Sequence, residues 1–207
     1  MLWGDSVVSS LRQSNSVIAQ QKSSMRTNIK ARRSAMKEVE HRNASRDVIA
    51  NVIGNVPLEP DDCVAAFWPV SNEPDIRLLL EVIVENGHKC ALPVVEEKEK
   101  PLSFRQYIPG MKLQPGPEGG VLQPAAESKI LHPNIVLVPL LAFDASCYRL
   151  GYGGGYYDRT LAGMRRQSNL LTVGIAFEWQ RVAMVPRNKY DQMLDCVVTD
   201  KKVWLVG

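Results

Sequence analysis

The chain has 207 residues, 45% of them hydrophobic and 23% charged, which is enough for one ordinary globular domain with a substantial core. No apolar run approaches the roughly 18 residues of a membrane span, so we expect no membrane partner. The net charge of +3 is uneven, because nine Lys and Arg stand against three acidic residues up to Arg46. This basic arm suits nucleic acid, a membrane surface or a phosphorylated small molecule. It lacks interleaved aromatic residues and a lysine block, so we expect no nucleic-acid partner.

Residues 1–21 are rich in Ser, Gln and Asn and lack the continuous apolar stretch of a secretory signal. We expect a disordered N-terminal extension there. A transit peptide is the alternative, since Ser is frequent and Asp5 is the only acidic residue, although Arg12 is the only arginine before Lys22. Residues 22–207 show no internal repeat and no linker, and we expect them to form a single domain.

The first predicted element of that domain is a helix over residues 22–36, with three apolar side chains on one face and Lys and Arg on the others. Lys22 and Arg26 are four residues apart and therefore project from the same face. Such a pair is most often an ordinary solvated face. A second helix is predicted over residues 43–55.

Short apolar runs alternate with helical segments through the rest of the chain. Strands are predicted over residues 63–70, 89–95, 102–107, 135–141, 170–177 and 196–199. A helix is predicted to begin around Asn72, with Pro74 in its first turn, and to end before Gly87. Residues 109–126 are rich in Pro and Gly and are predicted to be irregular, as binding loops often are. This alternation predicts an α/β fold with three layers, α/β/α, around a largely parallel sheet.

Four cysteines, Cys63, Cys90, Cys147 and Cys196, show no C-x-x-C spacing, which argues against a zinc site or a disulfide framework. We therefore expect reduced, mostly buried thiols in a cytoplasmic protein. Separately, we expect the protein to be a monomer.

Trp68 and Glu73 flank the junction between the first strand and its helix, at a sheet edge where ligand crevices form in α/β proteins. Two structural alternatives stand beside this reading. Glu73 would stabilise the N-terminus of the helix, and Trp68 would be a core residue.

A glycine-rich turn follows the strand over residues 135–141, and a second helix start follows the turn at Tyr156. Glycines allow backbone N–H groups to approach phosphate oxygens, and a helix start adds unpaired donors and a favourable dipole. The turn is neither a Walker A loop nor a dinucleotide fingerprint. A flexible surface turn is the alternative, but the Arg149 before the glycines and the Asp158 after them indicate a ligand site.

Residues 149–158, read as Arg-Leu-Gly-Tyr-Gly-Gly-Gly-Tyr-Tyr-Asp, closely resemble the signature Arg-Leu-Gly-x-Gly-x-Gly-Tyr-Tyr-Asp of the 5-formyltetrahydrofolate cyclo-ligase family. The resemblance extends in register from about Lys22 to about Asp200. It includes the family's Lys-x-x-Leu-Arg segment, which stands here as Lys22 to Arg26 with Met25 in place of Leu, and its closing Pro-x4-Asp-x3-Asp pattern at Pro186, Asp191 and Asp195.

The resemblance implies roles for particular residues. Contacts to ATP are implied for Lys22, Arg26, Arg149, Leu150, Gly151, Tyr152, Gly153, Gly154, Gly155, Tyr156 and Tyr157. Substrate contacts are implied for Trp68, Glu73, Tyr152, Gly153, Gly154, Gly155 and Tyr156. Arg149 and Tyr156 are implied as catalytic residues, and Asp158 and Asp191 as ligands of Mg²⁺. Asp195 is a rival to Asp191 and is expected to be structural.

The implied reaction is the ATP-dependent cyclisation of 5-formyltetrahydrofolate to 5,10-methenyltetrahydrofolate, a C–N bond-forming ligation that releases ADP and phosphate. One departure stands out. Many relatives carry a basic residue at the position of Tyr152 or Gly154, so we expect either Arg159 or Lys189 to supply that charge, or else weaker phosphate binding. The alternatives are a non-catalytic nucleotide- or RNA-binding protein, a sugar-phosphate isomerase and an acyl-CoA transferase, since fold alone does not decide function.

Overall fold

The computed structural model describes residues 4–117, 119–167 and 169–206, with side chains described from residue 16 onward. It contains a seven-stranded sheet in the order β11-β10-β9-β6-β1-β2-β3. The strands are β1 (Cys63–Ala65), β2 (Lys89–Val94), β3 (Ser103–Tyr107), β6 (Ile135–Pro139), β9 (Leu171–Ile175), β10 (Cys196–Val198) and β11 (Val203–Leu205). The five inner strands are mutually parallel, and β3 and β11 run antiparallel at the two edges.

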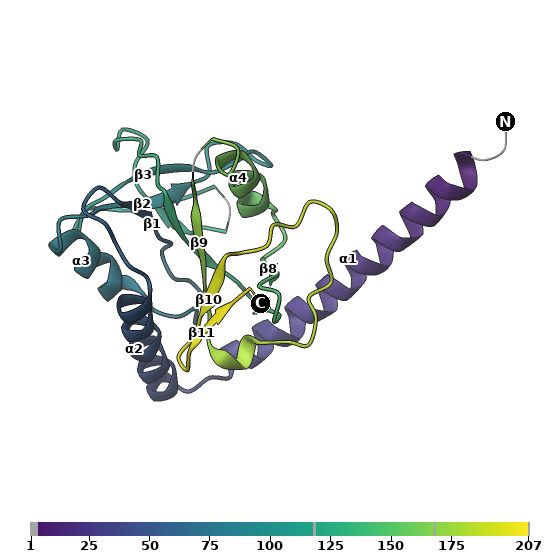
Figure 1. Ribbon diagram of the computed structural model, residues 1–207, viewed down its shortest axis with the longest axis horizontal. Helices are drawn as coiled ribbons and strands as arrows, with labels where there is room; N and C mark the ends of the chain where they lie inside the picture. The colour runs from purple at the N-terminus through teal and green to yellow at the C-terminus, as the bar shows by residue number, and fades with distance from the viewer. Residues whose placement is uncertain (1–3, 118, 168, 207) are drawn as a thin grey trace.

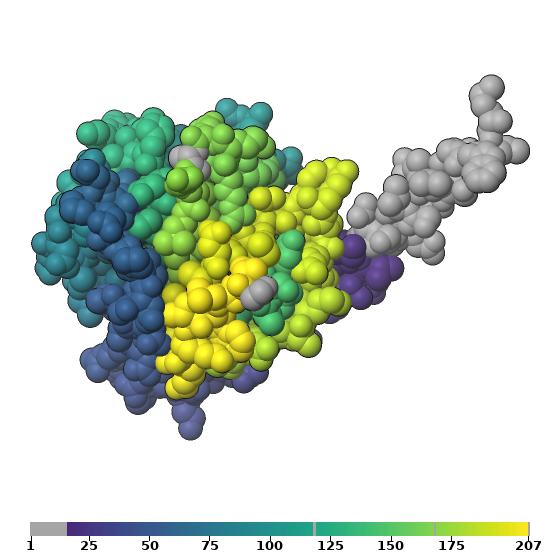
Figure 2. All heavy atoms as spheres, in the orientation of Figure 1, coloured from purple at the N-terminus to yellow at the C-terminus, as the bar shows by residue number. Residues whose placement is uncertain are grey.

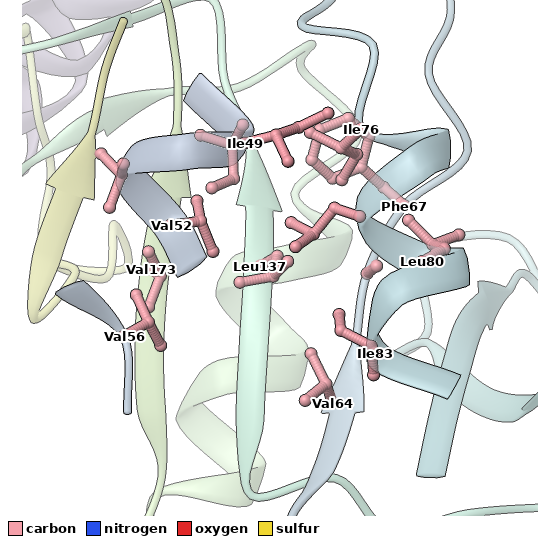
Figure 3. Packing of buried hydrophobic residues seen from close by; sticks show 14 of the residues in the cluster. Ile49, Val52, Val56, Val64, Phe67, Ile76, Leu80, Ile83, Leu137 and Val173 are labelled. Carbon is pink, nitrogen blue, oxygen red and sulfur yellow. The ribbon is translucent and has the colours of Figure 1, made fainter. Parts of the chain in front are cut away.

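Helices cover both faces of this sheet (Figure 1), which confirms the predicted three-layer α/β/α fold. One face carries α2 (Glu38–Asn55) and α3 (Arg77–Glu85), and the other carries α4 (Tyr156–Met164). Figure 3 shows Ile49 and Val52 of α2 and Ile83 of α3 packed around Leu137 of β6. Val136 and Val138 of the same strand point to the opposite core, with Leu161 of α4. The apolar run of β6 is therefore buried on both faces, as a central parallel strand requires.

The basic helix is longer than the sequence indicated. It spans Gly4–Ser34 as α1, so residues 4–21, which we expected to be a disordered extension, belong to the same helix as Lys22 and Arg26. Residues 1–3 lie outside the described part of the chain. The end of α1 packs against a hairpin of β7 (Ala142–Phe143) and β8 (Arg149–Leu150), where Ile29 is buried beside Leu141 and Leu150.

Two further predictions about local structure need correction. The strand predicted over residues 63–70 ends at Ala65, and α3 begins at Arg77 rather than near Pro74. The reason is a tight turn between them, in which Ser71 and Asn72 have φ values of +49° and +59° and the backbone N–H of Glu73 donates to the carbonyl of Val70. Such left-handed residues cannot start a helix, and Glu73 does not lie at a helix N-terminus.

The remaining elements are short. Residues 109–126 contain a small hairpin of β4 (Gln114–Pro115) and β5 (Leu122–Gln123), and a 3₁₀ turn, η1, spans Glu178–Gln180. All four cysteines are free and buried, as predicted. Within the described residues, no helix is both long and apolar enough to cross a membrane.

Candidate active site

The candidate site starts from the carboxyl ends of the neighbouring parallel strands β1 and β6 and is formed by four separate segments. They are the turn after β1 that carries Glu73, the loop of residues 151–155 after β8, the segment of residues 187–192 before β10, and the later part of α1. Figure 2 shows the purple surface of α1 directly beside the yellow-green surface of the segment before β10. Ligand crevices of α/β proteins form at the carboxyl ends of parallel strands because the loops that leave neighbouring strands converge there.

The glycine loop has the geometry of an anion cradle. Gly153 and Gly155 have φ values of +116° and +65°, which residues with a side chain rarely adopt. In the described chain, none of the backbone N–H groups of residues 151–155 has an acceptor. Gly155 is the N-cap of α4, and the first intrahelical bond runs from the N–H of Arg159 to its carbonyl at 3.2 Å. The loop and the first turn of α4 therefore offer a run of unpaired donors to a phosphate group.

The two cations predicted from the N-terminal helix reach this loop by different contacts. Lys22 Nζ donates to both carboxylate oxygens of Asp191 at 2.6 Å. Arg26 Nε donates to the carbonyl oxygen of Gly151 at 2.9 Å, and its guanidinium lies across Gly153, where a Cβ would be 3.5 Å from Cζ. Arg26 thus supports the loop directly, whereas Lys22 neutralises one of the two carboxylates predicted to hold metal.

Arg149 is buried and joins the loop to the segment before β10. Its Nη1 donates to the carbonyl of Gln192 at 2.7 Å, and its Nη2 donates to Asp158 Oδ1 at 2.9 Å. The backbone N–H of Gln192 donates to the same Oδ1 at 2.9 Å. Asp158 therefore compensates a buried guanidinium and also fixes the residue that follows Asp191, so the two predicted metal ligands are held in one neighbourhood.

Glu73 is 3% exposed and is held by two donors. The backbone N–H of Val70 donates to Oε2 at 2.9 Å, and the hydroxyl of Tyr152 donates to Oε1 in a short bond. Burial raises the pKa of Glu73, and the bonds from Tyr152 and Val70 and the charge of Arg33 oppose that rise. Burial, followed by the charge of Glu73, also raises the pKa of Tyr152, so this hydroxyl stays protonated and can donate. The Tyr152 contact connects the glycine loop to Glu73, the side chain that is predicted to contact the substrate.

Trp68 does not join this cluster. Its half-buried ring packs beside Tyr107, with ring centroids 6.0 Å apart, and under the guanidinium of Arg77. It lines a groove of about 680 Å³ between α2 and α3. His41 connects the two regions, because it lines the same groove and its Nε2 lies 2.7 Å from the carbonyl oxygen of Glu73.

Tyr156 and Arg159 shape the far side of the loop. The Tyr156 ring lies against Gly154, where a Cβ would come within 2.7 Å of it, and the Arg159 guanidinium lies 5.3 Å from the centre of that ring. Arg159 Nη2 donates to the carbonyl of Gly154 at 2.6 Å, whereas Lys189 lies over the ring of Tyr190. Of the two candidates for the missing basic residue, Arg159 is the one at the loop.

Sequence reasoning missed two cations on the same helix. Lys30 Nζ and Arg33 Cζ each lie 5.5 Å from the centre of the Tyr152 ring, and Arg33 Nη1 lies 3.9 Å from Glu73 Oε1. The signal was present, because residues 22, 26, 30 and 33 follow each other at intervals of four, four and three and so share one helix face. Only Lys22 and Arg26 belong to the Lys-x-x-Leu-Arg segment on which the sequence prediction was based.

Asp158 and Asp191 supply only some of the ligands that a magnesium ion needs, and the phosphates of a bound nucleotide would supply others. The described residues contain no group of three or more His, Cys, Asp and Glu that could hold a metal. Magnesium is often bound by one or two carboxylates together with substrate phosphates. Asp158 Oδ2 has no hydrogen-bond partner in the described chain and suits this role, whereas both oxygens of Asp191 are occupied by Lys22 and by the N–H of Asn188. In this structure, Asp191 is therefore engaged by Lys22 and Asn188 rather than free to hold a metal.

Asp195 has the structural contacts that we expected for it. Its Oδ2 accepts from the N–H and the hydroxyl of Thr172 at 2.7 and 2.6 Å, and it lies 3.5 Å from Arg165. These bonds tie the segment before β10 to β9, away from the glycine loop.

The fold and the site together define an α/β protein with a candidate anion-binding loop beside the ends of its parallel strands. Residues 18–200 match the profile of the 5-formyltetrahydrofolate cyclo-ligase family, so the chain belongs to this family and is an enzyme of the cyclo-ligase class. The match includes every residue of the predicted site.

Individual relatives agree with this assignment. The 5-formyltetrahydrofolate cyclo-ligase of Escherichia coli strain K12 is 29% identical over 181 residues, which cover 85% of this chain and 98% of that protein. The protein of the same name from Mycolicibacterium smegmatis is 32% identical over 148 residues, or 67% of this chain and 74% of the relative. The NMR structure of Aquifex aeolicus 5,10-methenyltetrahydrofolate synthetase has a TM-score of 0.76 at 29% identity, covering 89% of this chain and 92% of that chain.

Proposed function

We propose that this enzyme converts 5-formyltetrahydrofolate to 5,10-methenyltetrahydrofolate at the expense of ATP, within one catalytic unit formed by residues 22–207. The observation that supports this best is the bond between Tyr152 and Glu73. It brings a phosphate-binding type of loop within one side-chain length of a buried carboxylate that suits the paired N–H donors of a pterin ring. Family membership also argues against the non-catalytic nucleotide- or RNA-binding alternative.

The chemical problem is that the oxygen of a formamide is a poor leaving group. In the proposed reaction, this formyl oxygen attacks the γ-phosphorus of ATP, and ADP departs. N10 of the substrate then attacks the formyl carbon and forms the new C–N bond. The C–O bond breaks with release of phosphate, and the proton of N10 passes to solvent. Enzymes speed phosphoryl transfer mainly by positioning and charge neutralisation.

The residues of the chain divide this work between them. The unpaired N–H groups of the glycine loop and of the first turn of α4 hold the phosphate chain, and Lys22, Arg26 and Arg159 supply positive charge around it. Glu73 orients the pterin ring. Tyr156 supports the loop through Gly154. Arg149 supports the loop rather than contacting the phosphate, because both of its terminal nitrogens are engaged by Gln192 and Asp158.

Magnesium, when bound with ATP, would neutralise phosphate charge, and Asp158 and Asp191 would hold it. Lys22 would then exchange Asp191 for a phosphate oxygen. We extend the proposal to a cytoplasmic monomer that acts on a small-molecule substrate.

The direct test mixes the protein with Mg-ATP and 5-formyltetrahydrofolate and follows the ultraviolet absorption of the methenyl product. We expect product to form and ADP release to depend on the folate, because phosphoryl transfer needs the formyl oxygen as acceptor. The control omits the folate. Equal ADP release with and without 5-formyltetrahydrofolate would contradict the proposal.

We also expect Lys22→Ala to raise the Kd for ATP by about 10- to 100-fold, because a charge-assisted hydrogen bond to phosphate contributes roughly 1.5–3 kcal/mol. Isothermal titration calorimetry measures this change. Lys37→Ala is the matched control, since Lys37 is an exposed lysine just before α2, away from the loop. If Lys22→Ala binds ATP with unchanged affinity, Lys22 does not contact the nucleotide and serves only as the structural partner of Asp191.

A further inference from the structure

Arg33 is the most deeply buried charged residue that the proposed reaction leaves without a role. It lies in the last turn of α1 and is 1% exposed. Its Nε and Nη1 atoms are buried and have no hydrogen-bond partner in the described chain. Its nearest carboxylate oxygen, Glu73 Oε1, is 3.9 Å from Nη1, which is too long for a hydrogen bond.

Buried N–H donors without a partner are costly, especially on a charged group. A residue that served only as the counter-ion of Glu73 would close to hydrogen-bond distance, as Lys22 does with Asp191. Instead, Tyr152 occupies Glu73 Oε1 and its ring lies beside the Arg33 guanidinium. The two unused N–H donors of Arg33 therefore lie close to Glu73, the carboxylate that is proposed to bind the substrate. The ring of Tyr152, which belongs to the glycine loop, lies beside them.

A second buried donor without a partner comes from the first turn of α4. The hydroxyl of Tyr157 is buried and has no hydrogen-bond partner in the described chain. Two separate side chains, one from α1 and one from α4, thus hold buried donors that no group of the described chain satisfies.

The pterin ring of the proposed substrate has a matching edge. It presents the 2-amino group and N3–H, which are donors, beside the carbonyl oxygen on C4, which is an acceptor. A carboxylate takes the two donors, and a neighbouring guanidinium N–H takes the carbonyl. Glu73 and Arg33 form this pair of groups once the Tyr152 side chain moves off Glu73.

We propose that Arg33 is a further substrate-binding residue, whose guanidinium donates to the C4 carbonyl oxygen of the pterin while Glu73 accepts from the adjacent N–H groups. The assignment rests on the proposed function, since the ligand is the folate substrate. It makes Arg33 a specificity determinant that favours 4-oxo over 4-amino pteridines.

The test measures the affinity of two ligands for three proteins by calorimetry in the absence of ATP. The ligands are 5-formyltetrahydrofolate and the corresponding compound with an amino group in place of the C4 carbonyl. The proteins are the parent, Arg33→Met and the control Arg32→Met, in which an exposed arginine over Trp179 is removed from the same turn. We expect Arg33→Met to weaken binding of the 4-oxo ligand about tenfold or more relative to the 4-amino ligand. Arg32→Met should leave the ratio of the two affinities unchanged.

A merely structural role for Arg33 predicts a different result, in which both ligands lose affinity in the same proportion, and that outcome overturns the inference. If Arg33→Met does not fold, Arg33→Lys is read in the same way, because lysine keeps the charge but loses the planar set of donors. If the parent binds 5-formyltetrahydrofolate but Arg33→Met keeps its ratio of affinities, only the inference fails. If the parent does not bind 5-formyltetrahydrofolate at all, the proposed function fails and the inference falls with it.

Discussion

Replacing Asp158 by Asn should reduce the rate of methenyl product formation by about 100-fold or more, and it should also lower the free energy of unfolding. The rate falls for two reasons. Asn lacks the negative charge that suits a hard cation, and it no longer forms the ion pair that holds Arg149 beside the glycine loop. Small misplacements of this kind cost about 100-fold in phosphoryl-transfer geometry. Steady-state kinetics at several magnesium concentrations measure the loss, and added magnesium should restore part of it.

The stability cost comes from Arg149. The position of Asp158 in the first turn of α4 suggests only a weak dipole effect, of about 0.3–1 kcal/mol. The structure adds an ion pair to a buried guanidinium and a bond from the N–H of Gln192. Since Asn leaves that guanidinium uncompensated, we expect a loss of about 1–3 kcal/mol by chemical denaturation.

Asp195→Asn is the matched control for this variant. Asp195 also accepts a backbone N–H and pairs with an arginine, but its partners are Thr172 and Arg165, away from the glycine loop. The Asp195→Asn protein should be less stable than the parent but should keep most of the parent's activity and its magnesium dependence. An active, magnesium-insensitive Asp158→Asn protein would contradict the metal role and would direct attention to Asp191 and Asp195.

Glu73→Gln should raise the Kd for 5-formyltetrahydrofolate by about 10- to 100-fold while leaving the Kd for ATP nearly unchanged. The amide keeps one acceptor oxygen but places a donor against the N–H groups of the pterin, and an unsatisfied buried pair costs about 1–3 kcal/mol. Calorimetry with each ligand separately measures both constants. If the Kd for ATP rises and that for the folate does not, Glu73 belongs to the nucleotide site instead.

Tyr152→Phe gives a control of opposite sign. The Tyr152 hydroxyl occupies the Glu73 oxygen that the ligand needs, so its removal should leave the folate affinity equal or higher. The pH dependence gives an independent check. Because burial raises the pKa of Glu73, acidification should protonate it, and weaken folate binding, at a higher pH than for an ordinary glutamate.

Local features of the site were the ones that the sequence could indicate. The spacing of Lys22 and Arg26 predicted one shared helix face, and both side chains do contact the candidate site, at Asp191 and at Gly151. The glycines before Tyr156 predicted a turn into a helix, and Gly155 is the N-cap of α4. Helical periodicity and left-handed glycine conformations depend on a few neighbouring residues, so a local pattern is enough to reveal them.

Contacts between distant segments were not visible in the same way. Lys22 and Asp191 are 169 positions apart, and no pattern in the chain pairs them. Trp68 and Glu73 are close in sequence, but the left-handed turn at Ser71 and Asn72 separates their surroundings. Both results depend on how the loops leave neighbouring strands, which is a property of the folded sheet.

By itself, the sequence determined the layered α/β fold and the family, because alternating apolar segments and a contiguous glycine motif survive without any knowledge of packing. The tertiary structure alone decided which carboxylate each cation meets and which cation is buried. Four basic residues share one face of α1, but only packing against the Glu73 turn and Tyr152 buries Arg33 and leaves two of its nitrogen atoms unpaired. Burial is set by everything that covers a residue, and for Arg33 the covering segments come from distant parts of the chain.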